Sequence, residues 1–209
     1  MAGLETPCAL DQSHRRSEAA LRQADLSSLS PSEVTAVRFW QRIVGNARSA
    51  LILINAGQRE EAECVNQLAI ENLIYMATAL RSPASIERMK TAFNEAWTVL
   101  LEAATCRTAD AGTRPPSALS AAYDVLIEAE QRAFSTFEMA ELSDLQHLYT
   151  TRYRILATMS SCAFIACASR SQAERSVADV TVSLASIVDR AEDLARSFQL
   201  IGRSQARSR

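Results

Sequence analysis

The amino-acid sequence predicts an all-α protein, folded as a single-domain helical bundle of about six main helices. Its 209 residues include only 5 Gly and 5 Pro, which leaves few turn residues for β-hairpins. Ala, Leu, Glu, Gln and Arg, which favour helices, fill the positions between apolar residues. With 48% hydrophobic residues, a chain of this length can bury one substantial core, so we expect one domain.

The N-terminal segment, residues 1–29, is polar and irregular, and we expect a flexible arm that includes at most a short helix. The first strong helix start follows it at Ser30, with Pro31 in the first helical position and Glu33 completing a capping box. An apolar pattern then continues to Gly57, which can end the helix in a left-handed conformation. The sequence therefore predicts one long helix between Ser30 and Gly57.

The next helices are predicted from their start and stop signals. A second helix covers about 58–80, and a third begins with Ser82 as cap and Pro83 as first residue and continues through about residue 100. Residues 106–117 combine Gly112 with two prolines and are predicted to be a loop. A fourth helix is expected over about 117–137, and Ser143 is expected to cap a fifth that ends near residue 168.

The last helix, from about residue 172 to 200, has apolar residues at alternating steps of three and four, which forms a heptad seam. Such a seam either packs on the protein's own bundle, which we favour, or forms a homodimer contact through the C-terminal helix. Beyond it, residues 202–209 form a basic C-terminal tail. The seam consists of Val177, Val180, Leu184, Ile187, Ala191, Leu194, Phe198 and Ile201.

Composition excludes several classes of function. A formal net charge of -2 provides no general attraction for a nucleic acid, so a nucleic-acid partner is not expected. The 5 cysteines are odd in number and widely spaced, which indicates reduced thiols of a cytoplasmic protein. The N-terminus lacks the pattern of a signal peptide, and no apolar run approaches the roughly 20 residues of a membrane span. We expect a cytoplasmic protein that does not associate with membranes.

Sequence motifs for catalysis, metals and cofactors are missing. Neither His14 nor His147 follows a Glu at the spacing of a di-iron bundle, and the cysteines lack the close pairing of a zinc site. No serine lies in a nucleophile elbow, and the isolated glycines form no phosphate-binding loop. We therefore predict no catalytic residue, no metal ligand and no cofactor.

Two polar stripes remain as the candidate site. On the second helix, Glu71 interrupts an otherwise apolar run, at roughly 100° per residue on the side opposite Leu73. A matching polar line on the fifth helix includes Arg154. Either both stripes face water, or they enclose a polar seam in which Glu71 meets Arg154, because a shielded carboxylate requires a partner. The predicted seam consists of Gln67, Glu71, Tyr75, Tyr153, Arg154 and Thr158.

Segments 47–80 and 149–163 resemble an uncharacterised all-helical family of bacterial domains of unknown function. Its members combine an Arg-x-x-x-Glu pair with a later Tyr-Arg helix that carries a histidine. The resemblance places Glu71 at the family's glutamate and Tyr153 and Arg154 at the Tyr-Arg. Gln67 stands where the arginine is expected, and residues 160–162 stand where the histidine is expected.

The family is also similar in helical character to HEPN ribonucleases, whose chemistry depends on an Arg-x(4 to 6)-His motif. Neither histidine here follows an arginine at that distance. We therefore expect a non-catalytic helical interaction or regulatory protein whose protein partner is unknown. The alternative, which the resemblance alone implies, is a degenerate or unusual HEPN-like ribonuclease.

Overall fold

The computed structural model describes residues 6–109, 135–161 and 170–201. These residues form helices joined by turns, without a strand among them, which confirms the all-α prediction. In chain order the elements are α1 (Thr6–Leu21), the 3-10 turn η1 (Leu26–Ser28), α2 (Pro31–Asn55), α3 (Arg59–Arg81), α4 (Pro83–Ala109), α6 (Thr136–Leu142), α7 (Gln146–Leu148), the π-helix η2 (Tyr149–Tyr153), α8 (Arg154–Ser161) and α9 (Arg170–Ser197).

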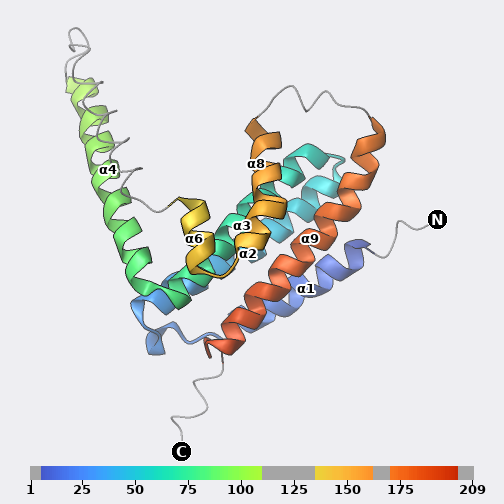
Figure 1. Ribbon diagram of the computed structural model, residues 1–209, viewed down its shortest axis with the longest axis horizontal. Helices are drawn as coiled ribbons and strands as arrows, with labels where there is room; N and C mark the ends of the chain where they lie inside the picture. The colour runs from blue at the N-terminus through green and yellow to red at the C-terminus, as the bar shows by residue number, and fades with distance from the viewer. Residues whose placement is uncertain (1–5, 110–134, 162–169, 202–209) are drawn as a thin grey trace, which may run out of the picture.

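Helix α3 forms the centre of the bundle (Figure 1). It packs along α2 and against α9, and α6 and α8 cover another side. Its second half is apolar around most of its circumference, and the apolar residues that are completely buried from position 69 onward are Ala69, Ile70, Leu73, Ile74, Met76, Ala77 and Ala79. A buried hydroxyl, that of Thr78, links α3 to α6 by donating to the carbonyls of Ile74 and Met139 at 2.9 and 3.0 Å.

The boundaries of α2 are the ones that the sequence predicts. The Ser30 hydroxyl accepts from the backbone N–H of Glu33, and the Glu33 carboxylate accepts from the N–H of Ser30, which completes the capping box. At the other end Gly57 has φ +77°, and the N–H of Gln58 donates to the carbonyl of Leu53 at 2.8 Å. This is a Schellman motif, in which the left-handed residue satisfies the last carbonyls of the helix.

Two further helices end in the same motif without a glycine. Asp144 follows α6 with φ 57°, and Gln199 follows α9 with φ 55°. The N–H groups of Leu145 and Leu200 reach back to the carbonyls of Ala140 and Ala195. Ser143 is therefore the C-cap of α6 and not the cap of a helix that starts at Asp144, which corrects that prediction.

Other predicted boundaries also require correction. Cys106 to Ala109 belong to α4, so the expected loop begins later than predicted, and its remainder lies outside the described residues. The expected fourth helix does not continue through Phe137, because Ser135 is the N-cap of the separate helix α6, with a capping box to Glu138. Most of that expected helix, residues 117–134, lies outside the described part, as do 162–168 of the fifth and the basic tail.

The predicted flexible arm is wrong for the residues that the structure describes, because Thr6–Leu21 form a helix that packs between α9 and α2. Leu10 and Ser17 are completely buried there. An ionic cluster fastens α1 to α9: Arg16 donates to the buried carboxylate of Glu192 at 3.0 Å, and the Ser17 hydroxyl donates to the same oxygen at 3.2 Å. Contacts with α9, more than 170 residues away, therefore order this segment.

The heptad seam of α9 faces the protein's own core. Val180, Leu184, Ile187 and Ala191 are at most 4% exposed, and Leu194, Phe198 and Ile201 pack against the same core. The side chain of Val177 lies outside those described. These contacts agree with the favoured interpretation, an internal seam, and they leave the homodimer contact without structural support.

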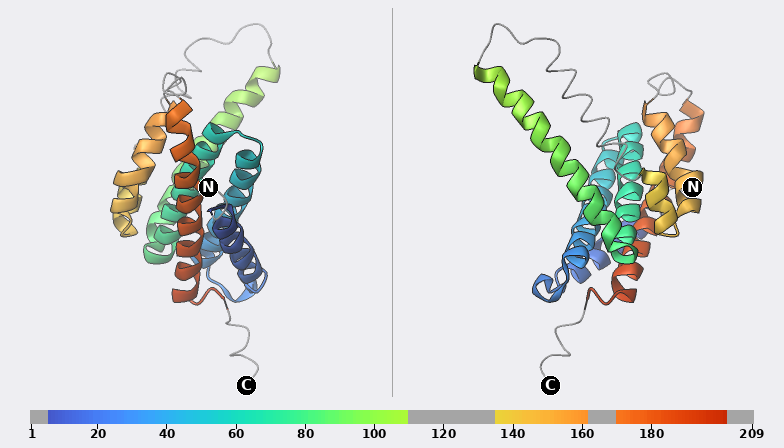
Figure 2. Two further views of the ribbon diagram at one scale, coloured as in Figure 1. Left: turned by 90° about the vertical axis from the view of Figure 1, so that its right-hand side faces the viewer. Right: turned by 60° about the vertical axis from the view of Figure 1, so that its left-hand side comes forward.

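Helix α4 leaves the bundle after its first turns (Figures 1 and 2). Ile86, Met89 and Ala92 are buried at its start, whereas Trp97 is 63% exposed. In the part of the chain that the structure describes, no helix is both long and apolar enough to cross a bilayer.

Candidate functional site

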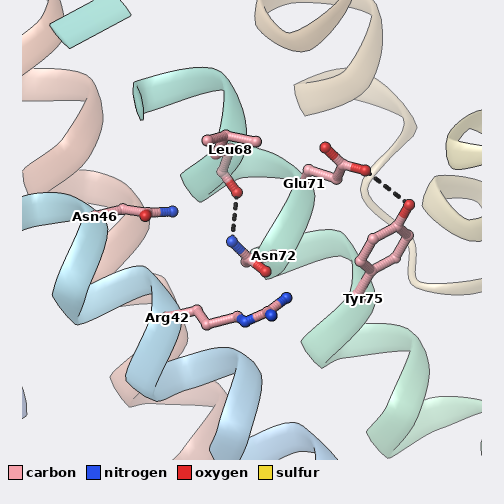
Figure 3. A pocket seen from close by; sticks show the side chains of 6 residues that line it. All are labelled: Arg42, Asn46, Leu68, Glu71, Asn72 and Tyr75. Atoms are coloured by element: carbon pink, nitrogen blue, oxygen red, sulfur yellow. Dashed lines mark hydrogen bonds between the residues drawn. The ribbon is translucent and has the colours of Figure 1, made fainter. Parts of the chain in front are cut away.

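A groove of about 300 Å³ lies between α2 and α3, next to the predicted seam residue Glu71 (Figure 3). Residues one turn apart line each wall, because positions i, i+3, i+4 and i+7 share one face of a helix. Helix α2 contributes Arg42 and Asn46, and α3 contributes Leu68, Glu71, Asn72 and Tyr75.

Glu71 is bonded within its own helix. The phenol of Tyr75, one turn further along α3, donates to Oε1 of Glu71 at 2.8 Å. Burial is the largest cause that raises the pKa of Tyr75 above its ordinary value, and the charge of Glu71 and this hydrogen bond add to it. The phenol is therefore protonated at neutral pH and acts as a donor, so this pair accounts for a carboxylate within an apolar run.

An aromatic ring of α2 packs against Tyr75, and a separate aromatic stack lies in the π-helix. The ring of Phe39 on α2 lies 5.5 Å from that of Tyr75 in a tilted arrangement. In the π-helix, Tyr149 and Tyr153 stack at 5.2 Å, and Phe137 of α6 meets Tyr149 edge-on at 5.4 Å. Tyr153 also adds to the raised pKa of Tyr75, so the π-helix lies within electrostatic reach of the Glu71–Tyr75 pair.

Several polar groups of the groove have no partner among the described residues. Arg42 forms no hydrogen bond or ion pair there, and Nδ2 of Asn46 is buried without an acceptor. Asn72 uses its Nδ2 to donate to the carbonyl of Leu68 at 2.7 Å, which leaves its Oδ1 as an acceptor. An unsatisfied buried N–H costs about 1–3 kcal/mol, and native proteins retain few of them. The groove therefore contains hydrogen-bonding capacity that the described fold does not use.

Both walls of the groove present polar groups. On α2, Arg42 is a donor and Asn46 presents an amide whose Nδ2 is buried, and on α3 the Oδ1 of Asn72 is an acceptor. Figure 3 shows Arg42 and Asn46 extending from α2 toward α3, with Asn72 between them and the Glu71–Tyr75 pair beyond. A molecule between Arg42 and α3 would meet a guanidinium and the amide of Asn72.

The predicted seam residues are only partly brought together. Gln67, Glu71 and Tyr75 are half-buried on α3, and Tyr153 is half-buried in the π-helix. Arg154 is exposed at the start of α8, and a Glu71–Arg154 ion pair is not among those found between described residues. The side chain of Thr158 lies outside those described.

The polar line of the fifth helix faces water where it is described. His147, Thr151 and Arg154 are all exposed, which agrees with the solvent-facing alternative for that stripe. The α3 stripe differs, because Glu71 is half-buried and hydrogen-bonded.

Sequence reasoning missed three polar groove residues, Arg42, Asn46 and Asn72, and also the apolar Leu68, although a signal for the α2 residues exists. A short turn at Gly57 joins α2 and α3 as antiparallel neighbours, so residues equally far from Gly57 lie side by side. Arg42 and Asn72 are each 15 residues from Gly57 (57 − 42 and 72 − 57). Counting outward from the turn would have paired them.

Groups of three or more His, Cys, Asp or Glu side chains that could hold a metal ion are not found in the described ranges. Comparisons with protein-family models, with curated proteins and with solved structures found no match to this chain.

Proposed function

We propose that this protein is a non-catalytic helical interaction or regulatory protein, and that the groove between α2 and α3 is its recognition site for a small polar ligand. The observation that carries this proposal is the set of groove groups without partners, above all the buried Nδ2 of Asn46 and the guanidinium of Arg42. Pockets that bind ligands typically combine a concave surface with a few convergent polar groups.

The chemistry of the groove favours binding over catalysis. Its lining includes no thiol, imidazole or aliphatic hydroxyl. The one hydroxyl, that of Tyr75, has a raised pKa and donates a hydrogen bond to Glu71, so it stays protonated and is a poor general base at neutral pH. Arg42 and the two asparagines are side chains that orient a ligand through hydrogen bonds.

The alternative function is a HEPN-like ribonuclease, and one observation favours it. Tyr149–Tyr153 form a π-helix directly before Arg154, and single π-turns are frequent at functional sites. We rank it second because the described residues at this position form an aromatic stack and include no His close to Arg154 other than the exposed His147.

We also propose that the protein acts in the cytoplasm of a bacterium and contacts a protein partner. The cytoplasmic assignment rests on the odd number and wide spacing of the 5 cysteines in the sequence, and Cys64 in the described part is an exposed free thiol. A homodimer through α9 is the less favoured arrangement, since the seam is buried within the chain.

Nuclease activity separates the two functions. Single-stranded and hairpin RNA, incubated with the purified protein, should remain intact. Cleavage by the wild type that is lost in both Glu71→Ala and Arg154→Ala would replace the proposed function with the alternative.

Ligand recognition has a test of its own. The low-molecular-weight fraction of a bacterial extract should shift the side-chain amide NMR signals of Asn46 and Asn72 in the wild type. The same fraction should leave those signals unmoved in Arg42→Met. Signals that do not move in the wild type would argue against recognition in the groove.

A further inference from the structure

The outer face of α2 carries a cationic surface, formed by Arg38, Arg42 and Arg48. All three side chains are exposed, and none of them has an ion pair or a hydrogen bond in the described part of the chain. Their own helix offers no counter-charge, since no Asp or Glu occurs between Glu33 and Glu60. Both arginines of α1, in contrast, are paired with carboxylates. The cationic surface therefore has positive charge that an acidic partner can neutralise.

Gly45 lies in the middle of the cationic surface, where the described fold gives no packing reason for a glycine. It is an exposed residue inside α2, and a Cβ added to it would meet no atom within 4 Å. A glycine inside a helix costs about 0.5–1 kcal/mol relative to alanine. The missing side chain does allow a second helix to approach closely, because the distance between packed helices depends on the side chains at their contact. The open space above Gly45 is therefore suited to a helix that crosses α2.

The spacing of these residues along α2 defines what a partner must present. Arg38, Arg42, Gly45 and Ile52 follow one line along the helix, at steps of three, four and seven residues, and Arg48 lies beside it. Ile52 is 61% exposed and provides an apolar contact at one end of the line. At roughly 1.5 Å per residue, Arg38 and Arg42 lie about 6 Å apart along the axis, and Arg42 and Arg48 about 9 Å apart. Carboxylates one turn and nearly two turns apart on a second helix reproduce these spacings.

We infer that the cationic surface of α2 docks an acidic amphipathic helix of a protein partner. This inference rests on the proposed interaction function and assigns its surface and its class of partner. Carboxylates of the partner pair with the arginines, its backbone crosses α2 at Gly45, and an apolar side chain contacts Ile52. Arginine is enriched at interfaces between proteins, whose centres are apolar. A nucleic acid fits less well, because the net charge of -2 opposes a polyanion and a phosphate backbone makes no use of Ile52.

Fluorescence anisotropy on the full chain tests the inference with a labelled peptide of about 20 residues, a length at which an isolated helix can form in water. The peptide carries glutamates along one face, at the spacings of the arginines, and leucines beside them. It should bind saturably at low salt with a Kd on the order of 0.1 mM or lower. The same peptide with glutamine in place of each glutamate should bind on the order of tenfold more weakly, because it loses the ion pairs with all three arginines.

Matched variants locate the binding. Arg38→Gln, Arg42→Gln and Arg48→Gln should each weaken the glutamate peptide about twofold to fivefold, as expected for exposed ion pairs. Gly45→Leu should weaken it on the order of tenfold, because the new side chain fills the space that the partner helix needs. Its melting temperature should not fall, since leucine favours a helix more than glycine does. Arg152→Gln removes the same charge from an exposed position of the π-helix and should bind like the wild type.

Three results would overturn the inference: a glutamate peptide that binds no better than the glutamine peptide, arginine variants of α2 that bind like Arg152→Gln, or full affinity in Gly45→Leu. A labelled single-stranded RNA serves as the rival probe. If it binds more tightly than the glutamate peptide and loses affinity in the same arginine variants, the surface belongs to a nucleic acid instead. Arg38, Gly45 and Arg48 do not line the groove between α2 and α3, so failure of this inference is distinguishable from failure of ligand recognition there.

Discussion

Replacing Glu192 by alanine should loosen the attachment of α1 to the rest of the bundle. Glu192 is 3% exposed and accepts hydrogen bonds from Arg16 at 3.0 Å, Ser17 at 3.2 Å and Arg196 at 2.6 and 3.1 Å. Burial raises the pKa of Glu192, but the hydrogen bonds and charges of Arg196 and Arg16 outweigh this effect and hold the pKa below its usual range. The carboxylate is therefore charged and fully partnered at neutral pH.

The loss of stability in Glu192→Ala depends on which hydrogen-bond partners of Glu192 can be solvated by water in the variant. The side chains of Arg16 and Arg196 are 53% and 60% exposed, so each lost ion pair costs only about 0.2–1 kcal/mol. The Ser17 hydroxyl is completely buried and loses its acceptor, which costs about 1–3 kcal/mol. Glu192→Ala should therefore lower the free energy of unfolding by about 2–4 kcal/mol. Glu192→Gln keeps an acceptor for Ser17 and should cost about half as much.

Urea denaturation at pH 7, followed by circular dichroism, measures these values. The exposed neighbour Asp193 provides the control, since Asp193→Asn should change the stability by less than about 0.5 kcal/mol. An Ala variant at Glu192 with the same urea midpoint as Asp193→Asn would refute the structural role of the cluster.

The pH dependence provides a second check on the same carboxylate. Because the folded pKa of Glu192 is lowered, its contribution is complete above the unfolded pKa of about 4.3 and is lost as the pH falls through the folded value. The difference between the wild type and Glu192→Gln should therefore narrow below about pH 4. A constant difference down to pH 3 would contradict the lowered pKa.

Three further predictions concern the turn, the tyrosine and the seam. Gly57→Ala should destabilise the protein by about 1–2 kcal/mol, because its φ is +77°. Gly45→Ala, inside α2 with open space at the added Cβ, should stabilise the protein by about 0.5–1 kcal/mol. Thermal unfolding measures both variants, and a change in stability of the same sign in Gly57→Ala and Gly45→Ala would contradict the conformational explanation. Absorbance titration of tyrosinate should show one of the 4 tyrosines ionising later than the rest in the wild type and not in Tyr75→Phe. Because the raised pKa favours the protonated phenol, the contribution of Tyr75 to the free energy of unfolding is present below about pH 10 and lost above it. If the stabilities of the wild type and Tyr75→Phe change in parallel above about pH 10, this explanation is contradicted. Leu184→Glu should cost about 3 kcal/mol or more without changing the oligomeric state in light scattering, whereas Val182→Glu, at a position 53% exposed on the same helix, should be nearly neutral. A dimeric wild type that becomes a stable monomer in Leu184→Glu would assign the seam to a dimer contact.

Some features of this protein follow from the sequence because they depend on residues close together in the chain. The start of α2 depends on Ser30, Pro31 and Glu33, and its end on the left-handed conformation that Gly57 adopts without a Cβ. The Ser82–Pro83 step separates α3 from α4 in the same local way. The capping box of Ser135 and Glu138 is equally local, but the apolar spacing around it predicts a continuous helix, which the structure divides at Ser135.

Tertiary structure decided the remaining features, because they depend on contacts between residues far apart in the chain. Asp144 and Gln199 end their helices with positive φ, although neither residue type signals a stop, since Leu145 and Leu200 directly after them are buried in the core. The sequence allows Glu71 either to face water or to lie in an enclosed seam with Arg154, and its position does not reveal a third partner, its own helix neighbour Tyr75, to which the structure gives the hydrogen bond. The sequence of the polar N-terminal segment predicts a flexible arm because its hydrogen bonds to Glu192 connect residues at least 175 positions apart. A local sequence pattern cannot encode such a contact, since only the folded bundle brings the two helices together.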